Sequence, residues 1–183
     1  MSYTTEDRYY SDPNDPIVPS QATRWNWLQC VIDGEEDDET PILPEDKKAL
    51  ALEDVLTGKW LLYRKDFPAT DALWPLLKVA LFSGLLGVSM KTSTPKQSKD
   101  DDDETVTCVY TKDWRDIEDI RRVLVGLREV TRWPNEKLYY KPDEMTLMGL
   151  SGSVYYSPRD DLITVTKKGH MWFDYKGLPP PKL

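Results

Sequence analysis

Hydrophobic and polar positions alternate along the chain with two different periods, and each period predicts a type of element. Apolar residues that recur every three or four positions predict helices over residues 44–56, 72–85 and 117–131. Apolar residues that alternate with polar ones over short runs predict strands. The predicted strands cover residues 59–65, 88–94, 105–111, 138–141, 154–156, 162–167 and 171–175.

The order of these elements indicates the fold class. After the helix at residues 44–56, the chain continues with a strand, a second helix, two strands, a third helix, one strand and a hairpin. Such an order is typical of an α+β protein in which helices cover one face of an antiparallel sheet.

The chain divides into three parts in this interpretation. Residues 1–44 are a largely disordered acidic extension, because prolines interrupt its first 24 residues. Residues 45–176 hold the α+β domain, and residues 177–183 form a proline-rich tail. An apolar docking patch at residues 25–32 interrupts the extension. Two interpretations of its first part, Trp25–Leu28, stay open: it docks on the domain as a lid or strand, or it is a linear motif for a protein partner.

The net charge of −8 is a sum of unlike parts, 24 Lys and Arg against 32 Asp and Glu. Residues 1–57 hold 14 acids and 4 bases, a balance of −10, and residues 58–183 hold 18 acids and 20 bases, a balance of +2. Five of those 18 acids are Asp100–Glu104, so the rest of this part stands at +7. The balance excludes a basic arm that coats nucleic acid and a uniformly acidic protein, and it leaves an anionic ligand open.

The cysteines and the apolar content predict the compartment. Cys30 and Cys108 lie in different kinds of segment, which predicts two free thiols in a reducing compartment. No stretch approaches the roughly 20 apolar residues that span a bilayer, and Met1–Tyr10 lacks an apolar signal core. We therefore expect a protein of the cytoplasm or nucleus that binds no membrane. Two cysteines and His170 are too few for a metal site, and no cofactor is predicted.

Polar residues at the ends of two predicted strands are the candidate ligand-binding site. If these two strands are neighbours, two lysines converge beside hydroxyl groups, an arrangement that suits a phosphate. The alternative is a pair of ordinary solvated strand ends. The residues are Lys91, Thr92, Ser93 and Thr94 on one strand, and Tyr140, Lys141 and Asp143 on the other.

Support for catalysis is thin, and support for base stacking is only general. Cys108 lies in an apolar strand, as packing residues do, and His170 has no Ser or Cys close in sequence. The phosphate-loop patterns GxxxxGK[ST] and GxGxxG are absent. We therefore predict no catalytic residue. Tryptophans could stack a nucleotide, and Trp114 and Trp133, which flank the Arg-bearing helix, are expected to be partly exposed.

Five segments in this order resemble the family of the basophilic leukaemia-expressed protein. They are Gly58–Tyr63 (GKWLLY), Gly87–Thr94 (GVSMKTST), Thr107–Asp113 (TCVYTKD), Glu118–Val123 (EDIRRV) and Leu138–Asp143 (LYYKPD). The resemblance covers about residues 55–157. It implies a fold similar to that of the cap-binding translation initiation factor 4E, a curved antiparallel sheet backed by helices. The family is a domain of unknown function that sometimes carries a phosphothreonine-lyase label.

The lyase label implies a lysine base, an acid for the leaving group and a cationic clamp on the phosphate. Lys91 or Lys141, His170 and Arg121 would fill these roles, and Arg121 thereby joins the candidate ligand-binding residues. Cap-binding factors hold a methylated guanine between two tryptophans, with a glutamate directly after one of them. In this chain no tryptophan is followed by Glu or Asp.

Three hypotheses follow for the function. The leading one is a non-catalytic binding module whose concave sheet holds a phosphate-bearing ligand, a nucleotide or an RNA end. The second is an enzyme of the phosphothreonine-lyase type. The third is a protein-interaction domain whose partner binds Trp25–Leu28 or the proline-rich tail.

Overall fold

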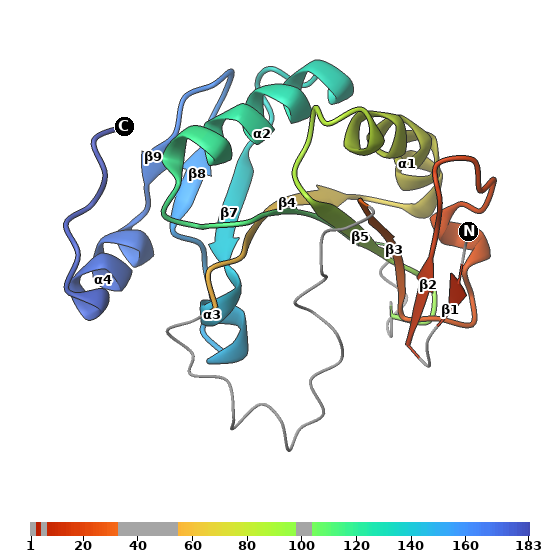
Figure 1. Cartoon of the computed structure of the whole chain (residues 1–183), viewed down its shortest axis with the longest axis horizontal. Helices are drawn as coiled ribbons and strands as arrows, with labels where there is room; N and C mark the ends of the chain where they lie inside the picture. Colours follow the sequence, from red (N-terminus) through yellow and green to blue (C-terminus); the bar gives the residue numbers. More distant parts are fainter. Residues whose placement is uncertain (1–2, 5–6, 33–54, 98–103) are drawn as a thin grey trace.

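A computed structural model describes residues 3–4, 7–32, 55–97 and 104–183 of the chain. Within these residues, nine strands form one curved, open sheet in the order β1-β2-β3-β5-β6-β4-β7-β8-β9. Helices α1 and α2 cover its convex face, and the concave face lies on the opposite side (Figure 1). The α+β class with a curved sheet backed by helices is therefore confirmed, with one parallel pair, β2 with β3, in an otherwise antiparallel sheet.

The bounds of the elements are as follows. The strands are β1 (Tyr3–Thr4), β2 (Arg8–Tyr10), β3 (Trp27–Val31), β4 (Gly58–Arg64), β5 (Ser89–Ser93), β6 (Thr105–Thr111), β7 (Leu138–Pro142), β8 (Tyr155–Ser157) and β9 (Thr164–Val165). The helices are a 3-10 turn (Pro19–Gln21), α1 (Phe67–Phe82), α2 (Ile117–Thr131), α3 (Asp143–Leu147) and α4 (Lys167–Lys176).

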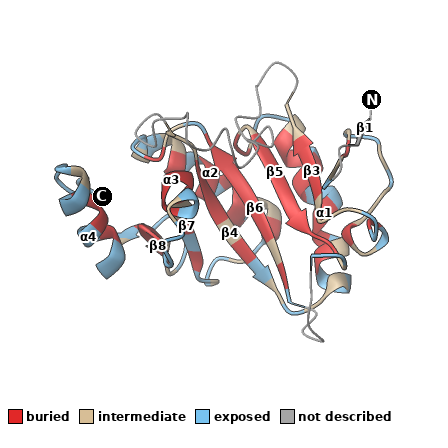
Figure 2. Cartoon of the chain, turned by 90° about the horizontal axis from the view of Figure 1, so that it is seen from below, coloured by how far each residue is buried: buried red, intermediate tan, exposed pale blue. Residues whose placement is uncertain are grey.

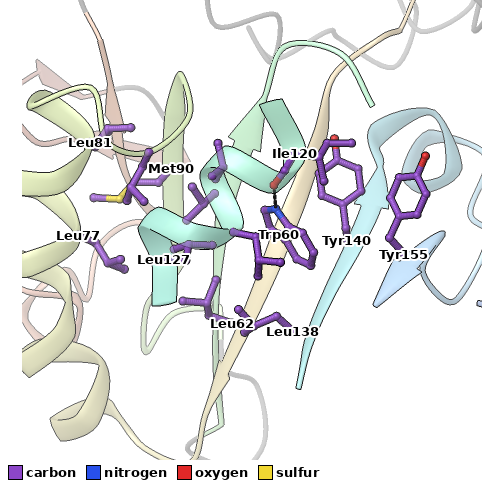
Figure 3. Packing of buried hydrophobic residues seen from close by; sticks show 14 of the residues in the cluster. Trp60, Leu62, Leu77, Leu81, Met90, Ile120, Leu127, Leu138, Tyr140 and Tyr155 are labelled. Atoms are coloured by element: carbon purple, nitrogen blue, oxygen red, sulfur yellow. Dashed lines mark hydrogen bonds between the residues drawn. The ribbon is translucent and has the colours of Figure 1, made fainter. Parts of the chain in front are cut away.

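The hydrophobic core fills the space between the convex face and the two covering helices (Figure 3). Trp60 on β4 is fully buried, and its indole Nε1 donates a hydrogen bond of 3.0 Å to the Ile120 carbonyl oxygen of α2. The Trp60 ring also meets the Tyr140 ring of β7 edge-on, with centroids 5.3 Å apart. These contacts fix which face of β4 and β7 points inward, and therefore which residues of the same strands point to the concave face.

Helix α1 begins earlier than its hydrophobic pattern predicts. The carboxylate of Asp66, rather than that of Asp71, caps the helix by accepting a hydrogen bond of 2.8 Å from the Ala69 backbone N–H. Pro75, expected in the first turn, therefore lies inside the helix, where it is exposed to solvent.

The last predicted strand, residues 171–175, is wrong: these residues belong to helix α4. Thr166 caps this helix, since its hydroxyl accepts a hydrogen bond of 2.8 Å from the Gly169 backbone N–H. Trp172 and Phe173 are both buried against the Trp114 ring. A short run that is rich in aromatic residues reads as a strand by period alone, and the Thr cap was the missed signal.

The beginning of the chain also differs from the expectation of disorder over residues 1–24. Residues 8–10 form β2, which pairs with β3, and Tyr10 and Ala22 are buried. β3 lies between β2 and β5 in the sheet. The segment Trp25–Leu28 therefore packs on the domain, partly as the beginning of β3, which is the first of the two interpretations above. The prolines shape the connection from β2 to β3 and do not prevent pairing on either side of it.

Two predictions fall on residues that the structure does not describe. The helix expected over residues 44–56 lies outside the described residues except for Val55 and Leu56, which have no regular structure. Most of the acidic loop expected over residues 95–104 likewise lies outside them.

Candidate ligand-binding site on the concave face

Three lysines lie on the concave face of the sheet. Lys59 alternates with the buried Trp60 on β4, Lys91 alternates with Met90 on β5, and Lys141 follows Tyr140 on β7. Figure 2 shows the sheet from this side, with β3, β5, β6 and β4 coloured as buried along most of their length. The sheet therefore has an apolar side toward the helices and a side that carries three cations.

Lys91 is enclosed by aromatic rings from two neighbouring strands. Its Nζ lies 4.7 Å from the ring centroid of Trp27 on β3 and 5.5 Å from that of Tyr110 on β6. Only 8% of the residue is exposed. Aromatic faces attract a cation, so these rings hold the ammonium group at this position.

Lys59 also contacts the Tyr110 ring, with its Nζ 5.2 Å from the ring centroid. It forms a buried ion pair with Asp143, the first residue of α3. The second carboxylate oxygen, Asp143 Oδ2, accepts no hydrogen bond within the described part of the chain. Asp143 is therefore held as the counter-ion of Lys59 and leaves one oxygen without a donor.

Lys141 pairs directly with Lys59 in the register of β4 and β7. Its Nζ donates a hydrogen bond of 2.6 Å to the Leu150 carbonyl oxygen, and the residue is only partly buried. Burial, and then repulsion from Lys59, lower the pKa of Lys141. An anion bound beside Lys141 would offset both effects.

The three lysines form a band across β5, β6, β4 and β7. Lys91 and Lys59 both contact the Tyr110 ring, and Lys59 pairs with Lys141. Ammonium groups therefore lie on three of these four strands, and Asp143 is the carboxylate that pairs with the central lysine.

The predicted convergence of Lys91 and Lys141 is corrected by the strand order. β6 and β4 separate β5 from β7, so the two lysines share a face but stand on strands that are three spacings, about 14 Å along the sheet, apart. Lys59 lies between them. The sequence interpretation missed it because it considered the ends of strands, whereas Lys59 is the second residue of β4.

Two of the predicted site residues point into the core. Thr92 is fully buried, and its hydroxyl accepts a hydrogen bond of 2.9 Å from that of Thr107. Tyr140 is also fully buried, and its phenol shares a hydrogen bond of 2.5 Å with the Thr111 hydroxyl. Consecutive strand residues face opposite sides, so a strand end cannot present all of its polar residues to one ligand.

The remaining predicted residues have structural partners at other places. The Ser93 hydroxyl accepts a hydrogen bond of 2.9 Å from the Val106 backbone N–H, and the Thr94 hydroxyl donates to the Trp25 carbonyl oxygen. Arg121 lies on α2, across the sheet from the lysines, and donates a hydrogen bond of 3.3 Å to the Asp161 carbonyl oxygen.

The structure does not assemble the residues that the lyase label implies. Lys91 and Lys141 are on the concave face, Arg121 is on the helix that covers the convex face, and His170 is exposed on α4. Among the described residues, no cluster of three or more His, Cys, Asp or Glu could hold a metal ion. Within the same part of the chain, every helix is too short or too polar to cross a membrane.

Of the two tryptophans beside α2 that were expected to be partly exposed, Trp133 is and Trp114 is not. Trp133 is partly buried beneath the Arg64 guanidinium, whose carbon lies 3.2 Å from the ring centroid. Trp114 is only 1% exposed, because the Trp172 and Phe173 rings of α4 cover it. Exposed rings on the concave face are tyrosines instead, Tyr63 on β4 and Tyr139 on β7.

The fold and this face define an α+β protein with a curved sheet, helices on its convex side and a lysine band on its concave side. The chain belongs to the family described as Basophilic leukemia-expressed protein Bles03, which it matches over residues 45–149, more than half of its length. The family resemblance of the five sequence segments is thereby confirmed. The comparison with curated proteins finds no match.

Three solved structures illustrate the structural likeness. "Complex of C. elegans eIF4E-3 with the 4E-binding protein Mextli and cap analog" is 18% identical, covers 62% of this chain and 60% of that chain, and has a TM-score of 0.43. The Ascaris suum eIF4E-3 complex with the m2,2,7G cap is 17% identical, covers 50% and 53%, and has a TM-score of 0.40. The Ascaris suum eIF4E-3 complex with the m7G cap is 17% identical, covers 63% and 61%, and has a TM-score of 0.42. The chain thus spans less than two thirds of the length of each.

Proposed function

We propose that this protein is a non-catalytic binding module for a phosphate-bearing ligand, a nucleotide or an RNA end, on the concave face of its sheet. The observation that carries the proposal is the band of Lys59, Lys91 and Lys141 over four neighbouring strands. Ammonium groups on a preformed sheet neutralise phosphate without first having to be brought together.

The ligand enters at the Lys141 end of the band in this proposal. Lys141 is the least buried of the three lysines, and the neighbouring Tyr139 on the same face is 36% exposed. Lys59 and Lys91 lie behind it and add their charge to the potential that the ligand meets. A phosphate beside Lys141 would exchange the hydrogen bond to the Leu150 carbonyl oxygen for a charge-assisted one.

A titration of the protein with nucleoside triphosphate, pyrophosphate and capped and uncapped short RNA tests this proposal. We expect Lys141→Ala to weaken binding about tenfold, because it removes a charge-assisted hydrogen bond. Lys91→Ala should weaken binding less. The matched control is Lys167→Ala, which removes an exposed lysine from α4 and should leave the affinity unchanged.

Two outcomes would contradict the proposal. One is equal affinity of the wild-type protein, Lys141→Ala and Lys91→Ala for all four ligands. The other is a change in the mass of a phosphothreonine peptide incubated with the wild-type protein, since β-elimination would remove phosphoric acid and show that the site is catalytic.

The alternative of a protein partner that binds Trp25–Leu28 gains less support from the geometry. Leu28 is fully buried in β3, and the Trp25 ring packs on the Tyr9 ring with centroids 4.8 Å apart. A partner that binds this segment would have to displace it from its pairing with β2 and β5.

A further inference from the structure

Three tyrosines project from neighbouring strands on the concave face. Tyr63 on β4, Tyr139 on β7 and Tyr156 on β8 each alternate with a buried residue of the same strand, and therefore share the face of the lysines. β4, β7 and β8 are consecutive in the sheet. Tyr139 and Tyr156 are direct cross-strand partners, and Tyr63 lies diagonally from Tyr139, two residues beyond its partner Leu61.

Two of these rings form a stack that is partly open to solvent. Tyr139 and Tyr156 are direct cross-strand partners, with ring centroids 5.8 Å apart and an angle of 27° between the ring planes. Tyr139 is 36% exposed and Tyr63 is 45% exposed. Tyr140 and Tyr155, the neighbours in sequence of the stacked pair, are fully buried in the core. Tyr156 is partly buried, so the stacked pair is partly open to solvent. Such a pair stabilises the sheet, and it also presents ring faces and edges to a ligand.

The charge beside these rings is positive. Lys141 is two residues from Tyr139 along β7 and on the same face, and Lys59 is the cross-strand partner of Lys141. A row of rings thus lies next to a row of ammonium groups. Single strands of nucleic acid have this pattern, with aromatic bases along one side and phosphates along the other.

We propose that the ligand of this face is a single-stranded nucleic acid, with successive bases stacked on Tyr139, Tyr156 and Tyr63 and the backbone phosphates facing Lys141. This inference rests on the proposed function and narrows its ligand from any phosphate-bearing molecule to a run of nucleotides. A mononucleotide would use only one ring. Several rings on consecutive strands offer stacking to several bases, as in binding that tolerates many sequences.

Fluorescence anisotropy with labelled six-nucleotide strands tests this inference. The probes are hexaadenylate RNA, the DNA hexamer of the same sequence, and an abasic hexamer with the same phosphates. We expect both base-bearing strands to bind more tightly than the abasic one, and Tyr139→Leu and Tyr156→Leu to weaken their binding about fivefold or more each. Tyr139→Phe keeps a ring and should bind like the wild-type protein.

The controls separate stacking from folding and from charge. Tyr175→Leu, which removes an exposed ring on α4, should leave binding unchanged, and circular dichroism establishes that each variant is folded. If hexamers with and without bases bind equally, or if the Tyr139→Leu and Tyr156→Leu proteins bind as the wild-type protein does, the inference is overturned. In that case a loss of binding in Lys141→Ala would still support the proposed function.

Failure of every probe to bind the wild-type protein would overturn both this inference and the proposed function. A protein partner would then remain as the ligand of the tyrosine face.

Discussion

The buried pair of Lys59 and Asp143 connects the first turn of α3 to the centre of the concave face. Both side chains are withdrawn from water, with relative exposures of 7% and 5%. Charges at such a site are tolerated only together, since either one alone would lose its hydration without gaining a partner. The pair thus sets both the position of Lys59 and the anchoring of α3.

Asp143→Ala should destabilise the protein by about 3 kcal/mol or more, because it leaves the buried ammonium group of Lys59 without its carboxylate. Urea denaturation measures this change as a fall in the midpoint. Asp119→Ala is the matched control, because it removes the partner of Arg122 in a pair that is largely open to solvent and should change the free energy of unfolding by at most about 1 kcal/mol. Equal effects of the two substitutions would show that the Lys59 pair is not buried.

The cysteines carry a second prediction at this scale. Both are buried thiols that form no disulfide, and burial raises the pKa of the Cys30 thiol from 9.0 to about 12. Because the thiolate is the reactive form, the Cys30 thiol of the folded protein should not react with a disulfide reagent at pH 8. Cys108 should be protected by its burial, and both thiols should react in guanidinium chloride. Since the unfolded thiol ionises near 9.0, the contribution of Cys30 to stability is present below that pH and is lost as the pH rises toward 12. Rapid labelling of Cys30 in a folded Cys108→Ala protein would contradict this account.

At the residue scale, the sequence predicted two lysines of the concave face correctly, but it did not predict toward which face of the sheet each strand residue points. It selected Lys91 and Lys141, which share the concave face, together with Thr92 and Tyr140, which point to the core. It also missed Lys59. The period of two along a strand contains this information, because the inward position of Trp60 places Lys59 on the opposite face.

At the scale of elements, the long periodic segments could be predicted and the short ones could not. β6 and α2 have the bounds that their hydrophobic pattern predicts. α4 reads as a strand in the sequence, because its two core contacts, Trp172 and Phe173, are adjacent and show no helical repeat. A helix that packs at the end of a sheet through only one or two side chains shows little of the helical repeat in the hydrophobic pattern of its sequence.

The connection from α1 to β5 contains a close approach that a substitution can test. A Cβ atom on Gly87 would lie 1.7 Å from the Tyr110 carbonyl oxygen, and the next residue, Val88, donates a backbone hydrogen bond to that oxygen. Gly87→Ala should therefore cost about 2 kcal/mol or more and displace Tyr110, whose ring contacts Lys59 and Lys91.

Thermal denaturation of Gly87→Ala against Gly84→Ala measures this effect. Gly84 has a φ of +78° and nothing within 4 Å of an added Cβ, so alanine there should cost only about 1 kcal/mol of backbone strain. A Gly87→Ala protein as stable as Gly84→Ala would show that the β5–β6 contact is looser than the structure has it.

At the scale of the whole molecule, the first strands complete one end of the sheet. β2 and β3 continue the sheet beyond β5, with Leu28 and Cys30 in the core. β2 is only three residues long, and the stretch between β2 and β3 is polar and contains Pro13, Pro16 and Pro19, so the local pattern does not distinguish residues 1–24 from an unfolded extension. Pairing with β5 supplies the stability that the local sequence lacks.

The uneven distribution of charge gives a prediction at the same scale. Replacing the five acids of Glu35–Glu39 by their amides changes the formal net charge from −8 to −3. We expect tighter binding of a polyanion such as polyuridylate at low salt, and the same affinity as the wild-type protein at high salt, since ions screen long-range repulsion.

Exchange of Glu and Asp at the same five positions keeps the charge and serves as the control. An amide variant whose affinity matches that of this control at every salt concentration would show that these acids do not restrict polyanion binding.

The central claim is that the concave face is the binding face. The most direct measurement is an NMR titration of the isotope-labelled protein with hexaadenylate, which follows backbone and lysine resonances together. The account predicts shifts that concentrate on Lys59, Lys91, Lys141 and Tyr139, with α1 and α2 unchanged. Shifts confined to the outer surfaces of α1 and α2, or no shifts at millimolar ligand, would contradict it.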